Sequence, residues 1–307
     1  MLRQRAHACD MAGFHVDKEA IIPLLQLPAL QQLGLWLNVP KAKRWLVKKR
    51  AKSLTNLALW ESNVVASDVR TFLRFAPNLR CFSYSFLRDY NNFWENERVD
   101  FAKVGSALKR VSATLSALTI EIQWISTLAG YKANLSRVRI SHLGPTPLGS
   151  LQSFGALKYI QLPFEVLVGP APYRPNILVK ILPPSLECLY FKDEMVIWNG
   201  VIHLNSHHSL QDIITVLADY LRNRHNHAPA LREVDIDLHD GVRYSGSCWF
   251  GHKWGIDEEY PPEAMQMRRL AAASRVRLTV VFDYVAEASL QTRTVRFVGQ
   301  THPEEEP

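Results

Sequence analysis

Three acidic side chains, Glu233, Asp235 and Asp237, alternate with Val234 and Ile236. In an extended strand they would share one face, with neighbours about 6.6 Å apart at ~3.3 Å of rise per residue. Two carboxylates at that separation can act as a catalytic pair. A strand that shows one face to solvent also carries such charges without any reactive role. The favoured interpretation of these three residues is therefore solvated surface charge. An acidic binding patch is the second interpretation and catalysis the last.

Four histidines flank one predicted helix: His207, His208, His225 and His227. The helix separates His208 from His225 by 17 residues, which is about 25 Å at ~1.5 Å per residue. One zinc ion cannot join ligands that far apart, and Cys248 with His252 supplies only two of the four ligands of a structural zinc site. The chain also lacks phosphate-binding glycine motifs, H-E-x-x-H and G-x-S-x-G. We expect no cofactor and no metal, and a protein that is not an enzyme.

The acidic strand is one copy of a spacing that recurs along the chain. In Leu182–Phe191 the pattern L-x-x-L-x-L falls on Leu186, Leu189 and Phe191, and the last two share one strand face. Such a unit cannot bury its apolar side alone, so neighbouring units are expected to stack. Eight copies start about 20 to 45 residues apart, at Leu30, Leu54, Leu79, Leu115, Leu135, Leu157, Leu186 and Leu231, and a degenerate ninth is Leu278/Val280/Phe282.

At these residues the chain resembles the leucine-rich-repeat region of fungal F-box/leucine-rich-repeat proteins. The phrases that carry the resemblance are LPALQQLGLWL, SLTNLALWES, FAPNLRCFSYSF and ILPPSLECLYF, within roughly residues 20 to 285. It implies an α/β fold, an irregular leucine-rich-repeat solenoid with parallel strands on the concave face and helices and loops on the convex face. The sequence departs from the repeat consensus at the position of the capping Asn or Cys. Only Asn38 matches the consensus there, and in the other copies different residues, such as Ser62, take that position.

Members of that family commonly act as substrate receptors of cullin-RING ubiquitin ligases, and an N-terminal F-box binds the adaptor. The segment before the first repeat is too short for an F-box and lacks its Leu-Pro-x-Glu-like start. Either the sequence is truncated or this member has lost ligase docking. The resemblance thus implies a non-enzymatic protein-interaction module, similar to a substrate-recognition region. The ligase adaptor is a partner only if an F-box lies upstream.

Residues that alternate with the apolar ones would tile the concave face, the usual binding surface of a solenoid. Trp36 and Trp60 hold equivalent positions in adjacent predicted strands, ~4.8 Å apart, and tryptophan is enriched among interface hot spots. We predict that a protein partner covers them, and the alternative is a segment of this chain. The other predicted partner-binding residues are Arg137, Arg139, Tyr190, Lys192, Glu233, Asp235 and Asp237.

A basic cluster lies between the first two predicted strands. We predict a solvated helix here, following Pro40. A nuclear-import signal and a nucleic-acid patch are the alternatives, and they give a second functional hypothesis, a nuclear or nucleic-acid-associated scaffold that uses the basic helix 41–52. No nucleic-acid-binding motif accompanies the cluster, so we predict a protein partner in preference to a nucleic acid. The cluster consists of Lys41, Lys43, Arg44, Lys48, Lys49, Arg50 and Lys52.

The 307 residues carry a net charge of +7 and no apolar run of the ~18 residues that a membrane span needs. Together with the absence of a signal peptide and of C-x-x-C spacing, this predicts a cytoplasmic or nuclear protein with no membrane partner. We expect a disordered segment over 1–18, the repeat domain over 19–285, and a cap strand with an acidic tail over 286–307.

Between the strands the sequence predicts several helices and one loop. Val65, Val69, Phe72, Leu73 and Ala76 follow the apolar spacing of an amphipathic helix, which Pro77 ends. Further helices are predicted over 101–111 and from Ser209 onward. The Gly/Pro-rich loop 142–150 is expected to be mobile.

Overall fold

The computed structural model describes residues 18–25, 27–37, 50–62, 64–89, 100–125, 146–169, 174–192, 210–222, 224–238, 269–286 and 291–299. Its strands form one open sheet in chain order, in which β1 to β8 are parallel. The strands are β1 (Gln32–Trp36), β2 (Asn56–Ser62), β3 (Cys81–Asp89), β4 (Ala117–Ile125), β5 (Tyr159–Pro163), β6 (Cys188–Lys192), β7 (Glu233–Leu238), β8 (Arg277–Ala286) and β9 (Gln291–Gly299). An α/β architecture is therefore confirmed.

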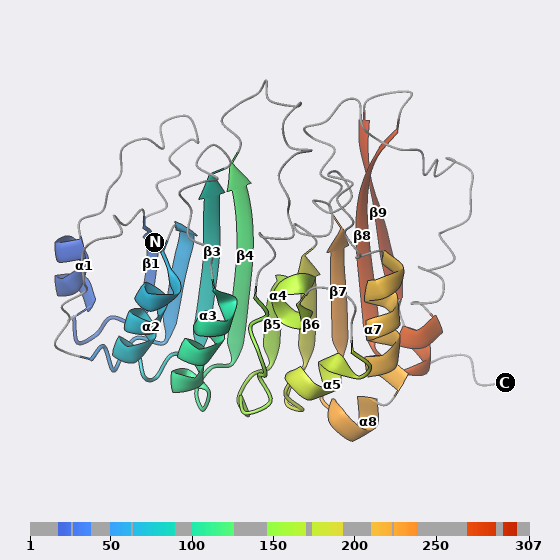
Figure 1. Ribbon diagram of the computed structural model, residues 1–307, viewed down its shortest axis with the longest axis horizontal. Coiled ribbons are helices and arrows are strands. Elements are labelled where there is room, and N and C mark those ends of the chain that lie inside the picture. Colours follow the sequence, from blue (N-terminus) through green and yellow to red (C-terminus); the bar gives the residue numbers. More distant parts are fainter. Residues whose placement is uncertain are drawn as a thin grey trace.

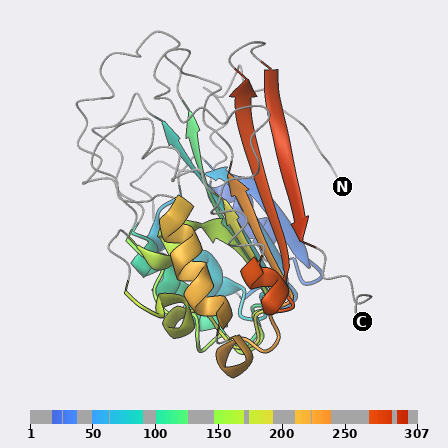
Figure 2. The same ribbon diagram turned by 90° about the vertical axis from the view of Figure 1, so that its right-hand side faces the viewer.

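The helices lie between these strands in the chain. They are α1 (Lys18–Leu25), α2 (Ala66–Phe75), α3 (Phe101–Leu108), the 3-10 turn η1 (Lys109–Val111), α4 (Phe164–Val168), α5 (Ile177–Ile181), α7 (Leu210–Arg222) and α8 (Arg224–His227). Figures 1 and 2 show α2, α3, α4, α5 and α7 on one face of the sheet. None of these five helices covers the opposite face, which we call the open face.

Two rows of apolar side chains run across the sheet on its helix-covered side and form the core. The first row pairs residue by residue through all eight parallel strands: Leu33, Leu57, Phe82, Leu118, Ile160, Leu189, Val234 and Leu278. The second lies two residues further along the strands from β1 to β7: Leu35, Leu59, Tyr84, Ile120, Leu162, Phe191 and Ile236. Seven members of the first row are at most 4% exposed. The predicted neighbours thus lie side by side in parallel.

One predicted strand does not take its place in this order. β4 pairs directly with β5 through residues 117–119 and 159–161, so the copy at Leu135/Val138/Ile140 is not a rung between them. Residues 126–145 lie outside the described part of the chain.

Six strands, β1 to β3 and β5 to β7, begin from the same turn. The N–H of the leading Leu donates to the carbonyl three residues earlier, as in Leu186 to Pro183 at 3.2 Å and Leu231 to Ala228 at 3.1 Å. Before β4 the turn is wider, because the Leu115 N–H donates to the Val111 carbonyl at 2.9 Å. From β2 to β7 two successive N–H groups then donate to one carbonyl of the preceding unit, as Glu187 and Cys188 do to Lys158 at 2.8 and 2.9 Å. These bonds fix the start of a strand relative to its neighbour, which sets the register.

A polar side chain just before the leading Leu links several units. Asn78 donates to the Lys52 carbonyl at 2.8 Å, Thr114 to the Leu79 carbonyl at 2.8 Å, and Ser185 to the Leu157 carbonyl at 2.9 Å. Ser53 makes the equivalent bond to Pro28. These bonds satisfy carbonyl groups at the turns. In these units the side-chain hydrogen bonds between neighbours are made just before the strand, whereas the repeat consensus places them at the Asn or Cys after it.

Ser62 nevertheless serves at the position where the repeat consensus has Asn or Cys. It is fully buried, accepts a hydrogen bond from the Leu37 N–H at 3.2 Å and donates to the Trp60 carbonyl at 2.8 Å. A serine hydroxyl can do both because it is at once donor and acceptor. The departure from the consensus at this position is therefore one of residue type and not of hydrogen bonding.

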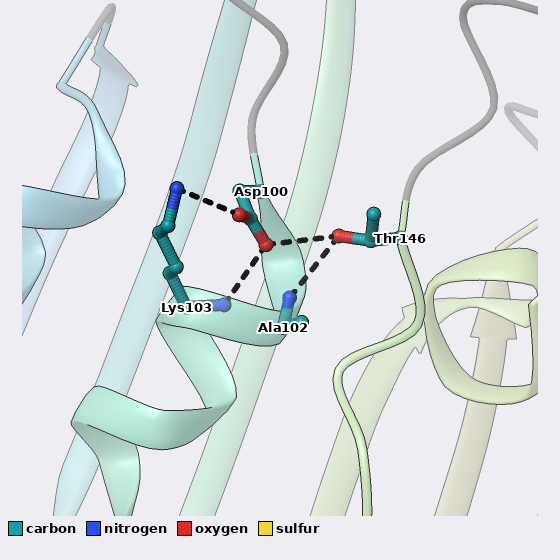
Figure 3. Close-up of polar contacts among 4 residues, drawn as sticks. All are labelled: Asp100, Ala102, Lys103 and Thr146. Carbon is teal, nitrogen blue, oxygen red and sulfur yellow. Dashed lines mark hydrogen bonds and ion pairs between the residues drawn. The ribbon is translucent and has the colours of Figure 1, made fainter.

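The N-terminus of α3 is tied to the end of the loop that was expected to be mobile (Figure 3). The Asp100 carboxylate accepts hydrogen bonds from the Lys103 N–H at 3.0 Å and the Thr146 hydroxyl at 3.2 Å, and Thr146 in turn accepts from the Ala102 N–H. The bonds from Lys103 lower the pKa of Asp100. This capping network and the buried side chain of Leu148 attach residues 146–150 to α3, whereas residues 142–145 of the predicted mobile loop lie outside the described part of the chain.

Three predicted helices are confirmed. α2 and α7 begin within one residue of the expected positions, and the helix expected over 101–111 is α3 followed by η1. The prediction of a basic helix over 41–52 is wrong at its C-terminal end, because Arg50 is not helical and Lys52 and Ser53 form a turn. In this turn the Leu54 N–H donates to the Ala51 carbonyl. Residues 41–49 and 1–17 lie outside the described part. β9 pairs antiparallel with β8, at the edge where a cap strand was expected.

Replacing Gly105 with Ala tests the contact between α3 and the 146–150 segment. A Cβ at this position would overlap the backbone carbonyl of Leu148, whereas one at Gly155 would meet nothing within 4 Å. Overpacking of this kind costs about 1–3 kcal/mol. We expect Gly105→Ala to lower the urea-unfolding free energy by that amount and Gly155→Ala to leave it unchanged. Equal midpoints for the two variants would contradict the described packing.

Candidate functional site

The N-terminal end of the open face carries two exposed indoles. Trp36 on β1 and Trp60 on β2 are register partners, 48% and 37% exposed. Their ring centroids lie 4.5 Å apart at an interplanar angle of 45°, within the range of favourable aromatic pairs. The two rings therefore form one continuous apolar platform, which we call the indole pair.

Gly34 makes this arrangement possible. Any Cβ at Gly34 would overlap the six-membered ring of Trp60, so the indole of β2 lies across the bare backbone of β1. The glycine is half-way along β1 and has an ordinary negative φ, which means that space rather than backbone conformation requires it. The indole pair is thus held by a specific close approach of side chain to backbone.

The middle of the open face carries a hydrogen-bonded polar chain. The Tyr159 hydroxyl donates to the Gln161 side-chain oxygen at 2.7 Å, and the Gln161 amide donates to the Glu121 carboxylate at 3.0 Å. Gln161 is the register partner of Thr119 and of Tyr190, so the chain links β4 to β5 on this face. The Glu121 carboxylate thereby accepts from Gln161, whose side-chain oxygen is in turn held by Tyr159.

The predicted acidic residues lie further along the sheet. Glu233 pairs with Arg277 of β8 and accepts a long hydrogen bond from the Cys188 thiol at 3.9 Å. Asp235 is the register partner of Tyr190 and of Thr279, and both Asp235 and Tyr190 are half-buried. These contacts leave Glu233 in a salt bridge rather than in a pair with Asp235.

Burial and nearby carboxylates shift two groups of this face. Partial burial raises the pKa of Tyr159, and the charges of Asp235 and Glu121 raise it further. Partial burial likewise raises the pKa of the Cys188 thiol, with Glu187 and Asp235 adding to the shift. Both groups therefore stay protonated at neutral pH, and the Tyr159 hydroxyl acts as a donor.

The predicted site residues do not converge on one place. The indole pair lies on β1 and β2, and the acidic residues lie on β7, five strand spacings from β2, or about 24 Å at ~4.8 Å each. Lys192 of β6 is the register partner of Asp237 of β7. Arg137 and Arg139 lie outside the described residues, and with no rung between β4 and β5 the reason for placing them mid-face no longer holds. Of the basic cluster only Arg50 and Lys52 are described, and both are exposed.

Sequence reasoning missed Glu121, Gln161 and Tyr159 as members of this face. Their signal was present: each alternates with a core residue, as Glu121 does with Ile120 and Ile122. Applying the same alternation to β4 and β5 would have found them.

The open face combines apolar and hydrogen-bonding groups. Within the described ranges no three His, Cys, Asp or Glu side chains lie close enough to hold a metal ion. The hydroxyl, amide and carboxylate groups of the polar chain are already ordered donors and acceptors, and the indole pair offers an apolar contact area. Such a combination of aromatic and hydrogen-bonding groups is typical of protein-binding surfaces.

No family model matches the chain, and no curated protein or solved structure is significantly similar to it. Among the described helices none has the length and apolar character needed to cross a membrane.

Replacing Gly34 with Ala tests how the indole pair is built. The overlap is with the far end of a side chain, so Trp60 can move and the fold should persist. In protein labelled with fluorotryptophan, we expect the ¹⁹F resonances of Trp36 and Trp60 to shift, while the unfolding free energy changes by less than about 1 kcal/mol. Gly155→Ala is the matched control. Unmoved indole resonances in Gly34→Ala would show that Trp60 does not lie over β1.

Proposed function

We propose that this chain is a non-enzymatic protein-interaction module, an irregular leucine-rich-repeat solenoid that binds a protein partner on its open face. The observation that carries the proposal is the indole pair, two adjacent and exposed tryptophans on a face that none of the five covering helices reaches. Large apolar side chains gathered at one exposed place mark interaction sites. Tryptophan is also the residue type most enriched among interface hot spots.

The strand order supports the solenoid. Successive units add neighbouring parallel strands in chain order, whereas a doubly wound sheet reverses direction at a switch point and binds its ligand there. Among the described helices, α2, α3, α4, α5 and α7 lie on one face of the sheet, as the two ribbon views show. In such a stack each unit buries its apolar edge against the next, and the remaining face is left for partners.

The family resemblance adds a more specific proposal. By that resemblance the open face corresponds to the substrate-recognition surface of an F-box/leucine-rich-repeat ubiquitin-ligase receptor. The ligase adaptor would be a partner only through an F-box upstream of this chain. The rival function, a nuclear or nucleic-acid-associated scaffold, depends on the basic cluster 41–52, and no contact among the described residues favours it over the indole pair.

Affinity capture with quantitative mass spectrometry tests the proposal, using wild-type chain and the double variant Trp36→Ala/Trp60→Ala as baits. Because each hot-spot truncation costs about 2 kcal/mol or more, we expect the variant to retain less than about a tenth of a stoichiometric protein partner. Leu27→Ala is the control, since Leu27 is 50% exposed and lies before β1.

Equal recovery of every stoichiometric partner by the double variant would reject the indole pair as the binding site. Recovery that depends instead on RNA, and is lost after nuclease treatment, would favour the scaffold. Capture of the ligase adaptor by the wild-type chain would show ligase docking without a recognisable F-box.

A further inference from the structure

Basic side chains gather at the end of the sheet where the parallel strands begin. Because β1 to β8 run in one direction, the segments that lead into them lie along one edge, the lower edge in Figure 1. The entry of every strand from β2 to β8 carries at least one exposed basic residue. We call this set the basic band; it consists of Arg50, Lys52, Arg80, Lys109, Arg110, Lys158, Lys180, Arg232, Arg275 and Arg277.

Backbone hydrogen bonds hold part of the basic band in a straight row. The N–H groups of Arg80, Lys158 and Arg232 donate to carbonyls of the preceding strand entries at 2.7, 2.9 and 2.8 Å. These three residues therefore stand at the same level of β3, β5 and β7, about 9.6 Å apart at ~4.8 Å per strand. From β2 to β8 the band extends over six strand spacings, or about 29 Å.

The positive charge of the basic band is largely uncompensated. Glu187 lies 2.9 Å from the Lys158 ammonium group and 3.8 Å from the Arg232 guanidinium group, and Glu233 pairs with Arg277. All three of these basic side chains remain more than half exposed. The other seven form no ion pair with any carboxylate in the part of the chain that the structure describes: Arg50, Lys52, Arg80, Lys109, Arg110, Lys180 and Arg275.

The helix dipole explains only part of the basic band. A cation in the last turn of a helix is stabilised by the partial negative charge of the C-terminus, as Lys180 is in α5. Arg80 and Arg232 instead follow the leading Leu of their units and lie outside the helices. Like charges in one row repel each other and lower stability. A bound polyanion that neutralises the row accounts for it.

The composition of the basic band favours a nucleic acid over an acidic protein. Protein interfaces place apolar and aromatic groups at their centre, whereas nucleic-acid interfaces are more polar and more positively charged. Among the described residues the exposed large apolar side chains are Leu24, Leu27, Trp36 and Trp60, and none of them belongs to the band. The band thus lacks both the apolar anchor of a protein interface and the aromatic platform on which single-stranded bases stack.

We propose that the basic band binds the sugar–phosphate backbone of a double-stranded nucleic acid without sequence preference. Lys and Arg side chains that neutralise phosphates release condensed counterions, and this release supplies non-specific binding. Arg50 and Lys52 are the described end of the basic cluster 41–52, so the band continues that cluster along the sheet. The inference goes beyond the proposed function and does not rest on it, because the indole pair lies further along β1 and β2.

The test measures fluorescence anisotropy of dye-labelled probes with the full chain at several salt concentrations. The probes are a duplex RNA and a duplex DNA of mixed sequence, each of about 16 base pairs, which is twice the length that the band can follow at ~3.4 Å per base pair. A single strand of the same length and a glutamate-rich peptide of equal charge complete the set. The tighter-binding duplex identifies RNA or DNA as the source of the phosphates.

We expect both duplexes to bind more tightly than the single strand and the peptide. The logarithm of the duplex association constant should fall with the logarithm of the salt concentration with a slope of about −3 to −6, since each neutralised phosphate contributes about −0.9. Duplexes of different sequence should give the same affinity within about threefold, because phosphate contacts carry no sequence information.

Two double variants of equal charge change locate the binding. Arg80→Gln/Lys180→Gln removes two exposed cations of the basic band, and we expect it to weaken duplex binding at least about tenfold and to reduce the salt slope by about two. The control, Arg70→Gln/Lys103→Gln, removes two exposed cations of α2 and α3 outside the band. It should change the affinity less than about threefold, since salt screens charges that do not touch the ligand.

The proposal is overturned if neither duplex binds at low salt, or if the single strand binds more tightly than both duplexes. Tighter binding of the glutamate-rich peptide would overturn it as well and would make the basic band a surface for an acidic protein. Equal weakening by the two double variants would place the phosphate contacts outside the basic band and so reject it.

Discussion

The structure depends on the mutual burial of two rows of apolar side chains that run across eight parallel strands. No single unit could bury Leu57 and Leu59, or Leu189 and Phe191, because a strand of five to seven residues has nothing of its own to cover them. Neighbouring strands supply the sides of each row and the helices supply its cover. The register follows from this constraint, since a slip of one residue would move every core side chain to the other face.

The same alternation creates the surface that we assign to binding. Once every second residue is committed to the core, the others face away from the helices, and no packing requirement fixes their type. That freedom accounts for the variety along the open face, from the indole pair through the tyrosines and carboxylates to the salt bridge of β7 and β8. Where these residues are nevertheless specifically arranged, as at Gly34 and Trp60 or at Tyr159, Gln161 and Glu121, the arrangement calls for a functional reason.

Much of the fold could be predicted from the sequence, because a strict apolar spacing has few other solutions. The two apolar positions of each copy, the parallel neighbours and the helices α2, α3 and α7 follow from local pattern. The copy at Leu135 shows where pattern fails: its spacing is as good as that of Leu157, yet β4 pairs directly with β5. Likewise, nothing local in residues 142–150 shows that Thr146 caps α3 and that Leu148 is buried.

The candidate site was less predictable, because it depends on which exposed residues touch. The indole pair could be inferred from equivalent positions in two copies. The polar chain could not, because its members come from strands 42 residues apart at their starts and are ordinary residue types. The basic band is visible only when the whole sheet is assembled, because its members come from the entries of seven strands.

The central claim is that the strands lie in chain order with one common register, and distances between spin labels test it directly. Labels at Ala58, Ser83, Thr119 and Thr279 would sit on β2, β3, β4 and β8 in one open-face row, in a background without native cysteines. From Ala58 the account predicts separations that grow with strand number, to about 29 Å for the six spacings to Thr279. A separation from Ala58 to Thr279 shorter than that from Ala58 to Thr119 would contradict it.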